Sequence, residues 1–88
     1  MKEIVFVQKA FKEYQQWVVI DRKMALRIGD LIKDISREPF KGIGKPEALK
    51  YEFKGCWSRR IDNEHRLIYS VTQTSIIIYS CYSHYTSV

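Results

Sequence analysis

Cysteine and histidine are scarce in this chain, and their scarcity bears on which sites it can form. The 88 residues include two cysteines, Cys56 and Cys81, and two histidines, His65 and His84. The cysteines form no CxxC pair, and no histidine stands at metal-ligand spacing beside either, so the sequence does not favour a zinc site. We expect no cofactor, and two reduced thiols that serve as packing residues.

Long hydrophobic runs are also missing. The longest purely apolar runs are about four residues, whereas roughly 20 are needed to span a bilayer. The opening segment, MKEIVF, lacks the extended apolar run of a signal peptide. These features predict a cytoplasmic protein that does not associate with a membrane.

The length and the charge of the chain narrow its class further. A chain of 88 residues has room for one domain, which we expect to span residues 1–88. Its composition, 45% hydrophobic and 28% charged, is that of a globular protein. The net charge of +5 and the pI of about 9.3 favour a polyanionic partner, such as nucleic acid or an acidic protein. The alternative is a slightly basic soluble protein without such a partner.

The first half of the chain predicts one strand and two helices. Residues 2–7 read as a short strand. From Gln8 the period changes, and a helical face appears at Phe11, Tyr14, Trp17 and Val18; we interpret its three aromatic residues as core packing. A second helix follows an N-cap and ends at a proline, and it carries a longer apolar stripe. Its N-cap is Asp21, its stripe comprises Met24, Ala25, Ile28, Leu31, Ile32 and Ile35, and the proline is Pro39.

The second half predicts a loop and then strands. Residues 40–52 contain two glycines and a proline, and they suggest a structured loop. Its Gly42, Gly44 and Lys45 only faintly resemble a phosphate-binding loop and do not match that pattern. Residues 56–61 and 65–71 predict a hairpin, and residues 75–83 a further strand that is central or covered on both faces. The fold class is therefore α+β, with the helical hairpin packed on one sheet.

The ionisable residues outside the helices have the composition of a site that cleaves RNA. Arg59, Arg60 and Arg66 lie on the predicted hairpin, and they predict a phosphate or carboxylate partner. Glu47 precedes the hairpin, and His84 follows the last strand. A base for the 2′-hydroxyl, cations for the phosphorane and an acid for the leaving oxygen are what this reaction needs. Taken singly, Glu47 and His84 can equally be solvated residues without a role.

Four segments carry a resemblance to a known family. They are KPEALK at 45–50, GCWSRRI at 55–61, EHRLIY at 64–69 and HY at 84–85, and residues 31–34 and 39–40 agree with them. Together they resemble the YoeB (Txe/YoeB) toxins of the RelE/ParE superfamily of bacterial toxin–antitoxin modules. The resemblance covers nearly the whole chain, and the combination of Trp57-Ser58-Arg59-Arg60 with Glu64-His65-Arg66-Leu67 is specific.

The resemblance implies a fold and an activity. The fold would be RelE/ParE-like: an N-terminal strand, a helical hairpin, then antiparallel strands in one sheet packed on the helices. The activity would be a metal-independent, ribosome-dependent endoribonuclease, an mRNA interferase that cuts mRNA in the A site and inhibits translation. The implied partners are mRNA, the ribosome with its rRNA, an acidic antitoxin of the YefM/Axe type, and a second copy of the chain in a homodimer.

The resemblance also implies roles for individual residues. Glu47 matches the general base, Arg66 the arginine that stabilises the phosphorane, and His84 the general acid. Lys50 and Arg60 match cationic positions near the scissile phosphate, and Tyr85 matches a terminal tyrosine that contributes to base stacking or to order in the site. We assign Arg59 a supporting part in phosphate binding, and His65 a structural part in the hairpin.

The chain departs from the family pattern at a few positions. Ala48 stands where proline is frequent, Cys56 where an aromatic residue is frequent, and Tyr82 where a basic residue is common. Residues 86–88 extend past the usual ending. These departures bear on the efficiency and codon preference of cleavage, and they remove no residue of the implied catalytic set.

Two other functions remain open from the sequence. A ParE-like toxin would have the same fold and would act by binding a protein target, without nuclease activity. A plain RNA-binding module would bind RNA in a salt-dependent way and would leave the RNA intact. The Glu47–His84 pair distinguishes the nuclease, because ParE-like members generally lack it.

Overall fold

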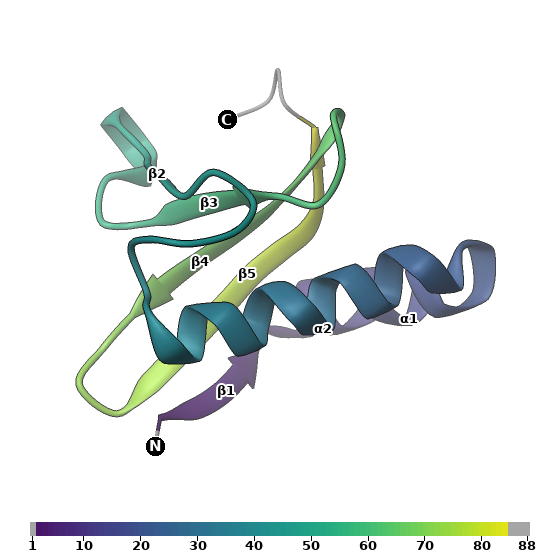
Figure 1. Cartoon of the computed structure of the whole chain (residues 1–88), viewed down its shortest axis with the longest axis horizontal. Helices are drawn as coiled ribbons and strands as arrows, with labels where there is room; N and C mark the ends of the chain where they lie inside the picture. Colours follow the sequence, from purple (N-terminus) through teal and green to yellow (C-terminus); the bar gives the residue numbers. More distant parts are fainter. Residues whose placement is uncertain (1, 85–88) are drawn as a thin grey trace.

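A five-stranded sheet with two helices on one face forms the fold (Figure 1). The computed structural model of the chain describes residues 2–84, with only the backbone for His84. In chain order the elements are β1 (Glu3–Phe6), α1 (Gln8–Ile20), α2 (Arg22–Arg37), β2 (Glu47–Ala48), a 3₁₀ turn η1 (Tyr51–Phe53), β3 (Trp57–Arg60), β4 (His65–Val71) and β5 (Ser75–His84). The predicted α+β class is confirmed.

The strand order across the sheet is β1-β5-β4-β3-β2. The pairs from β5 to β2 are antiparallel, as predicted, whereas β1 pairs with β5 in parallel. The sheet is therefore mixed. The two-residue strand β2 lies inside the segment that the sequence predicts to be a loop. It pairs with β3 through Glu47 and Ala48, and two residues are too few to leave a strand pattern in the sequence.

Helix α2 follows the sequence prediction closely. The Asp21 side chain accepts a hydrogen bond from the backbone N–H of Lys23, as an N-cap does. Four residues of the predicted stripe are buried in the core, namely Ala25, Ile28, Leu31 and Ile35. The helix ends at Arg37, and the extended backbone of Glu38 is what a residue before proline prefers.

Helix α1 departs from its predicted packing. Trp17 is buried as expected, but the Phe11 side chain is 50% exposed and packs edge-on against Phe6. The prediction of a core role for Phe11 is therefore wrong. The helix is rotated because Glu13 and Trp17 face β5: Glu13 Oε1 accepts from the Cys81 N–H (2.8 Å), and Trp17 Nε1 donates to the Cys81 carbonyl (2.7 Å). Helix α1 thus occupies the edge of β5 beyond the end of β1.

Strand β5 is an interior strand of the sheet, as the apolar run at 76–78 predicts. It lies between β1 and β4, and Ile76 and Ile78 are fully buried. Its register with β4 shifts twice between Arg66 and Tyr69, and each shift places one extra residue on β5. Such bulges bend a strand and increase its local twist.

Candidate functional site

The sheet register brings three of the predicted site residues to one face. Residues directly opposite in antiparallel strands share a face, as do residues two apart along a strand. Glu47 is opposite Ser58, Ser58 is two residues before Arg60, and Arg60 is opposite Arg66. Glu47, Arg60 and Arg66 therefore lie on the same side of β2, β3 and β4.

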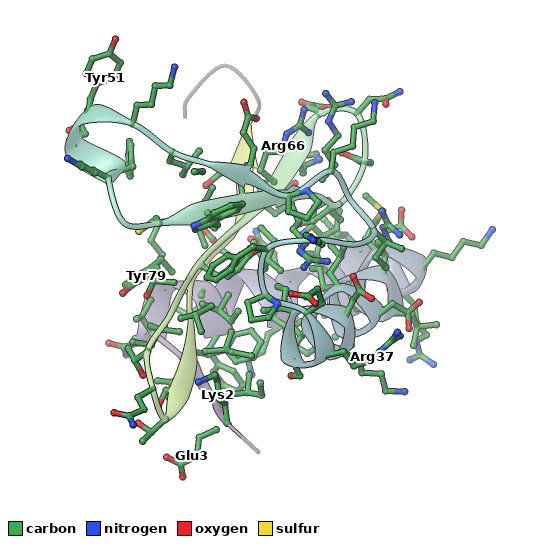
Figure 2. The ribbon with its side chains drawn as sticks, turned by 60° about the vertical axis from the view of Figure 1, so that its left-hand side comes forward. Lys2, Glu3, Arg37, Tyr51, Arg66 and Tyr79 are labelled. Atoms are coloured by element: carbon green, nitrogen blue, oxygen red, sulfur yellow. The ribbon has the colours of Figure 1, made fainter. Side chains whose placement is uncertain are left out.

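This side is the face of the sheet turned away from the helices. The alternate residues Arg59, Leu67 and Tyr69 point the other way: Leu67 and Tyr69 belong to the core, and Arg59 contacts Asp34 of α2. We call this side of the sheet the open face, meaning the face that the helices do not cover, and define it by Glu47, Ser58, Arg60, Arg66 and Ile68; of these, Ser58, Arg66 and Ile68 are themselves buried. In Figure 2 the Arg66 side chain lies toward one end of the molecule, far from Arg37 on α2.

Glu47 is held in place by the backbone on both sides of it. The Arg60 N–H donates to the Gly44 carbonyl (2.7 Å), and the Leu49 N–H donates to the Cys56 carbonyl (2.9 Å). Lys45 adopts a left-handed conformation with φ of 51°, which turns the chain into β2. The Glu47 side chain is exposed, so its carboxylate is accessible to a ligand. Lys50, also exposed, follows β2 at the start of the η1 turn.

Arg66 is nearly buried, with 4% of its surface exposed. Its Nη1 donates to the carbonyls of Asp62 (2.9 Å), Asn63 (3.3 Å) and His65 (3.1 Å), so the turn between β3 and β4 holds this end of the guanidinium. Arg60 is half-buried, and its backbone is fixed by a donor from Arg27 Nη2 to its carbonyl (3.2 Å). Two guanidiniums on neighbouring strands make this part of the open face strongly cationic.

Asp62 holds the turn that holds Arg66. Its Oδ1 accepts from the backbone N–H groups of Glu64 (2.9 Å) and His65 (2.6 Å), which is an Asx-type turn. Burial works against the charged form, but these N–H groups and the His65 ring outweigh it and keep the pKa of Asp62 below its ordinary value.

His65 has the structural role that the sequence predicts. Its Nδ1 lies 3.2 Å from Asp62 Oδ1. The ring packs edge-on against Trp17 of α1 and against Tyr82 of β5. Tyr82 itself stacks on Trp17 with the ring centres 4.6 Å apart. Its ring therefore joins the hairpin to α1.

Arg59 does not join the predicted phosphate-binding set. Its side chain is fully buried beneath the sheet, and all five of its N–H groups have partners. Nε donates to the Tyr69 hydroxyl, Nη1 to Asp34 and to the Ile43 carbonyl, and Nη2 to the carbonyls of Glu38 and Lys41. Its anionic partner is thus the Asp34 carboxylate, and we correct the predicted role: Arg59 stabilises the fold.

Asp34 was not singled out by the sequence, because its partner lies 25 residues away with no local pattern joining them. The hydrogen bond from Arg59 is the main reason that the pKa of Asp34 lies below its ordinary value. The loop glycines serve the same cluster. A Cβ on Gly42 would lie 1.9 Å from Asp34 Oδ2, and one on Gly44 would lie 2.8 Å from Leu31 Cδ2. Both glycines have positive φ and permit close packing.

The remaining predicted residues are only partly described. The backbone of His84 is opposite His65, and that of Ser83 is opposite Arg66, so β5 brings the end of the described chain to the hairpin. The His84 side chain, Tyr85 and residues 86–88 lie outside the described residues. Within the described part, no cluster of three His, Cys, Asp or Glu residues is arranged to hold a metal ion. No helix there is long and apolar enough to cross a bilayer.

The arrangement suits a phosphodiester. An accessible carboxylate can accept a proton, and two guanidiniums can bind non-bridging phosphate oxygens. Asp62 supports Arg66, and a signal for it was available in the sequence, because Asp at the start of a polar turn favours Asx geometry.

Comparison with known proteins identifies relatives over nearly the whole chain. A family model described as "YoeB-like toxin of bacterial type II toxin-antitoxin system" matches residues 6–85. A toxin YoeB from Streptomyces coelicolor is 48% identical, over 93% of this chain and 98% of the relative.

Two solved structures are similarly close. A YoeB dimer from Staphylococcus aureus superposes with a TM-score of 0.90 at 45% identity, covering 96% of this chain and 98% of the other. A YoeB–YefM complex from the same organism superposes with a TM-score of 0.88 at 43% identity, covering 97% and 99%.

Proposed function

The chain belongs to the YoeB family of toxins from bacterial type II toxin–antitoxin systems, and from that premise we propose that it is an endoribonuclease that cleaves mRNA in the ribosomal A site. The observation that carries the proposal is the register of β2, β3 and β4. It places one exposed carboxylate, Glu47, on the same open face as Arg60 and Arg66.

In the proposed reaction, Glu47 removes the proton from a ribose 2′-hydroxyl. The 2′-oxygen then attacks the adjacent phosphorus, and the bond from phosphorus to the 5′-oxygen breaks. Arg66 stabilises the charge that develops on the phosphorane oxygens, and His84 returns a proton to the leaving 5′-oxygen. The products are a 2′,3′-cyclic phosphate and a 5′-hydroxyl. DNA is not a substrate, because it lacks the nucleophile.

Other residues of the proposed site bind the RNA. Arg60 lies beside Arg66 on the open face and is suited to the scissile phosphate. Lys50 supplies a further cation at the end of β2, and Tyr85 contributes to base stacking or to order in the site. The roles of His84 and Tyr85 rest on the family resemblance alone.

The proposal includes two protein partners. Solved relatives of this chain form a YoeB dimer and a complex with YefM. We propose that this chain likewise forms a homodimer and binds a YefM-type antitoxin, whose acidic segment is complementary to the net charge of +5. We further propose a cytoplasmic location, because the proposed activity acts on translating ribosomes.

The test uses ribosomes programmed with a defined message, and the message ends are mapped after incubation with the protein. We expect cleavage in the A site by the wild-type chain, and losses of about 10²-fold or more for Glu47→Gln and His84→Gln. Glu3→Gln is the matched control, because Glu3 is an exposed glutamate at the other end of the molecule (Figure 2).

Three results would count against the nuclease assignment. Cleavage that is unchanged in Glu47→Gln would remove the proposed base. Intact messages together with inhibition of a supercoiling enzyme would favour the ParE-like alternative. RNA binding that produces no cyclic phosphate would favour a plain RNA-binding module.

A further inference from the structure

A cavity opens beside the proposed catalytic face. It has a volume of about 310 Å³, at the small end of the range for small-molecule sites. Lys9 of α1 lies at one side of it. The other residues that line it come from the η1 segment, β4 and β5, namely Phe53, Cys56, Ile68, Tyr79, Ser80 and Ser83.

The cavity is continuous with the open face. Ile68 lies opposite Ser58, which lies opposite Glu47, so the three form one row across the sheet. Ser83 lies directly opposite Arg66. A ligand that places a phosphate against Arg66 therefore has its neighbouring group at the mouth of the cavity, since adjacent strands are about 4.8 Å apart.

The lining favours a flat and largely apolar occupant. The Phe53 side chain is 38% exposed and that of Tyr79 is 36% exposed, so both rings offer surface to a ligand. Among the described residues neither ring packs against another aromatic ring, whereas Trp17, Phe40 and Trp57 do. In Figure 2, Tyr79 projects from the side of the sheet away from α2.

Polar groups are few in the cavity, and they are mostly hydroxyls. Ser80 and Ser83 share a hydrogen bond of 2.6 Å. Among the described residues that line the cavity, the charged one is Lys9, and it forms an ion pair with Glu13 (2.7 Å) that offsets its charge. This chemistry does not suit a phosphate or a carboxylate. It suits a nucleobase, which stacks on an aromatic ring and forms hydrogen bonds along its edge.

We propose that this cavity binds the base of the nucleotide next to the scissile phosphate. Phe53 and Tyr79 are the stacking surfaces, and the Ser83 hydroxyl contacts the edge of the base. The inference rests on the proposed nuclease function, because it takes Arg66 as the phosphate-binding residue. It assigns part of the substrate specificity to η1 and β5, away from the residues that carry out the reaction.

The test measures binding without cleavage. A short 2′-O-methyl RNA cannot be cut, because its 2′-oxygen is blocked, and a matched oligonucleotide lacks one base beside the central phosphate. Their affinities for the wild-type chain, Phe53→Ala and Phe11→Ala are compared at low salt. Phe11 is the matched control because its ring is 50% exposed and packs on Phe6, outside the cavity.

We expect Phe53→Ala to weaken binding of the complete RNA by roughly 5- to 150-fold, the range for one stacked base. It should have no further effect on the oligonucleotide that lacks the base, and Phe11→Ala should change neither affinity. Equal affinities of the wild-type chain for the two oligonucleotides would overturn the inference. The inference would also be overturned if Phe53→Ala and base removal had additive effects on the free energy of binding, or if the complete RNA did not bind.

Cys56 provides a second readout, because its half-buried thiol lines the cavity. The complete RNA should slow alkylation of Cys56 by a neutral maleimide, and unaltered labelling at saturating RNA would contradict the inference. Cys81 does not interfere, because it is buried and its burial raises the pKa of its thiol to about 12.

Two further outcomes separate the possibilities. If Phe53→Ala weakens binding of an acidic antitoxin peptide and leaves RNA binding unchanged, the cavity is a peptide site and the inference is wrong. Failure of the nuclease proposal would be seen instead as uncut message on ribosomes, a measurement that does not enter the binding comparison.

Discussion

Arg59 and Arg60 are neighbours in the sequence, yet they serve opposite faces of the same strand. Arg60 lies on the open face with Arg66, and Arg59 is buried beneath the sheet against Asp34. The period of two in a strand separates them. A buried guanidinium is tolerated here because all five of its donors have partners, and four of these are groups of Asp34 and of the loop that follows α2.

The first prediction concerns this ion pair. Asp34→Ala leaves the Arg59 charge buried without its carboxylate, and we expect the free energy of unfolding to fall by about 3–5 kcal/mol. Urea denaturation measures the change. Asp30→Ala is the control, because Asp30 lies four residues earlier on α2 and is exposed; its effect should stay within about 0.5 kcal/mol. Equal effects of the two substitutions would show that the pair contributes little.

The second prediction is the loss of stability in acid. The folded state lowers the pKa of both Asp34 and Asp62 below the ordinary value of 3.8. A lowered pKa contributes stability that is fully present above the ordinary value and is lost as the pH falls through the folded value. Melting temperatures should therefore decline below about pH 4. The melting temperature of Asp62→Asn should decline less steeply than that of the wild-type chain. An acid profile identical to that of the wild type would contradict the assignment for Asp62.

At the scale of elements, the segment between α2 and β2 is ordered by side chains from elsewhere. The Arg59 guanidinium binds its carbonyls at Glu38, Lys41 and Ile43, and the Tyr69 hydroxyl donates to the Pro39 carbonyl (2.6 Å). The ordered segment leads through Gly44 into β2 and thereby positions Glu47. The faint likeness of the segment to a phosphate-binding loop thus has a structural explanation.

The third prediction compares two glycines. Gly42→Ala forces a Cβ onto Asp34 at a φ of +123°, so it should lower the free energy of unfolding by more than about 1 kcal/mol. Gly29→Ala lies within α2 with nothing within 4 Å of the added Cβ, so it should raise stability by about 0.5–1 kcal/mol. Urea denaturation measures both changes in the free energy of unfolding. Effects of the same sign would contradict this account of the loop.

The fourth prediction concerns the turn between β3 and β4. Asp62→Ala removes the acceptor for two backbone N–H groups and should displace the carbonyls that hold Arg66. We expect the single-turnover rate of message cleavage on ribosomes to fall by roughly 10- to 100-fold. The concentration of programmed ribosomes that gives the half-maximal rate should change less. Asp62→Asn keeps an acceptor oxygen and should restore most of the rate. A similar loss in both variants would indicate that the charge matters, and not the turn.

Helix α2, the hairpin of β3 and β4, and the interior position of β5 follow from periodicity, capping and turn residues in the sequence. The exposure of Phe11 could not be predicted, because the rotation of α1 is set by the contacts of Glu13 and Trp17 with Cys81, about 64 to 68 residues away. The proposed catalytic residues were indicated by the family resemblance. Which of Arg59 and Arg60 is buried could be decided only from the strand register, because composition does not show which face of the sheet the helices cover.

At the scale of the whole molecule, the net charge of +5 predicts the salt dependence of RNA binding. The three proposed phosphate contacts, by Lys50, Arg60 and Arg66, should give a slope of about −2 in a plot of log affinity against log salt concentration. The fifth prediction is that Arg60→Gln reduces this slope by about 0.7, while Arg37→Gln, a change at an exposed arginine of α2, leaves it unaltered. Anisotropy titrations with the 2′-O-methyl RNA measure both slopes. An affinity that does not change with salt concentration would exclude RNA binding through these cationic side chains.

The position of β5 has a consequence for how the protein is made. Among the described strands it is synthesised last, and it lies in the interior of the sheet between β1 and β4, where β1 pairs with it across 72 residues of chain. A chain that has not reached residue 75 therefore lacks the strand that joins β1 to β4, the core residues Ile76, Ile78 and Cys81, and Ser83 opposite Arg66. We expect the chain to fold completely only once residues 75–84 have been synthesised, so the proposed activity on ribosomes would be absent while the chain is still being made.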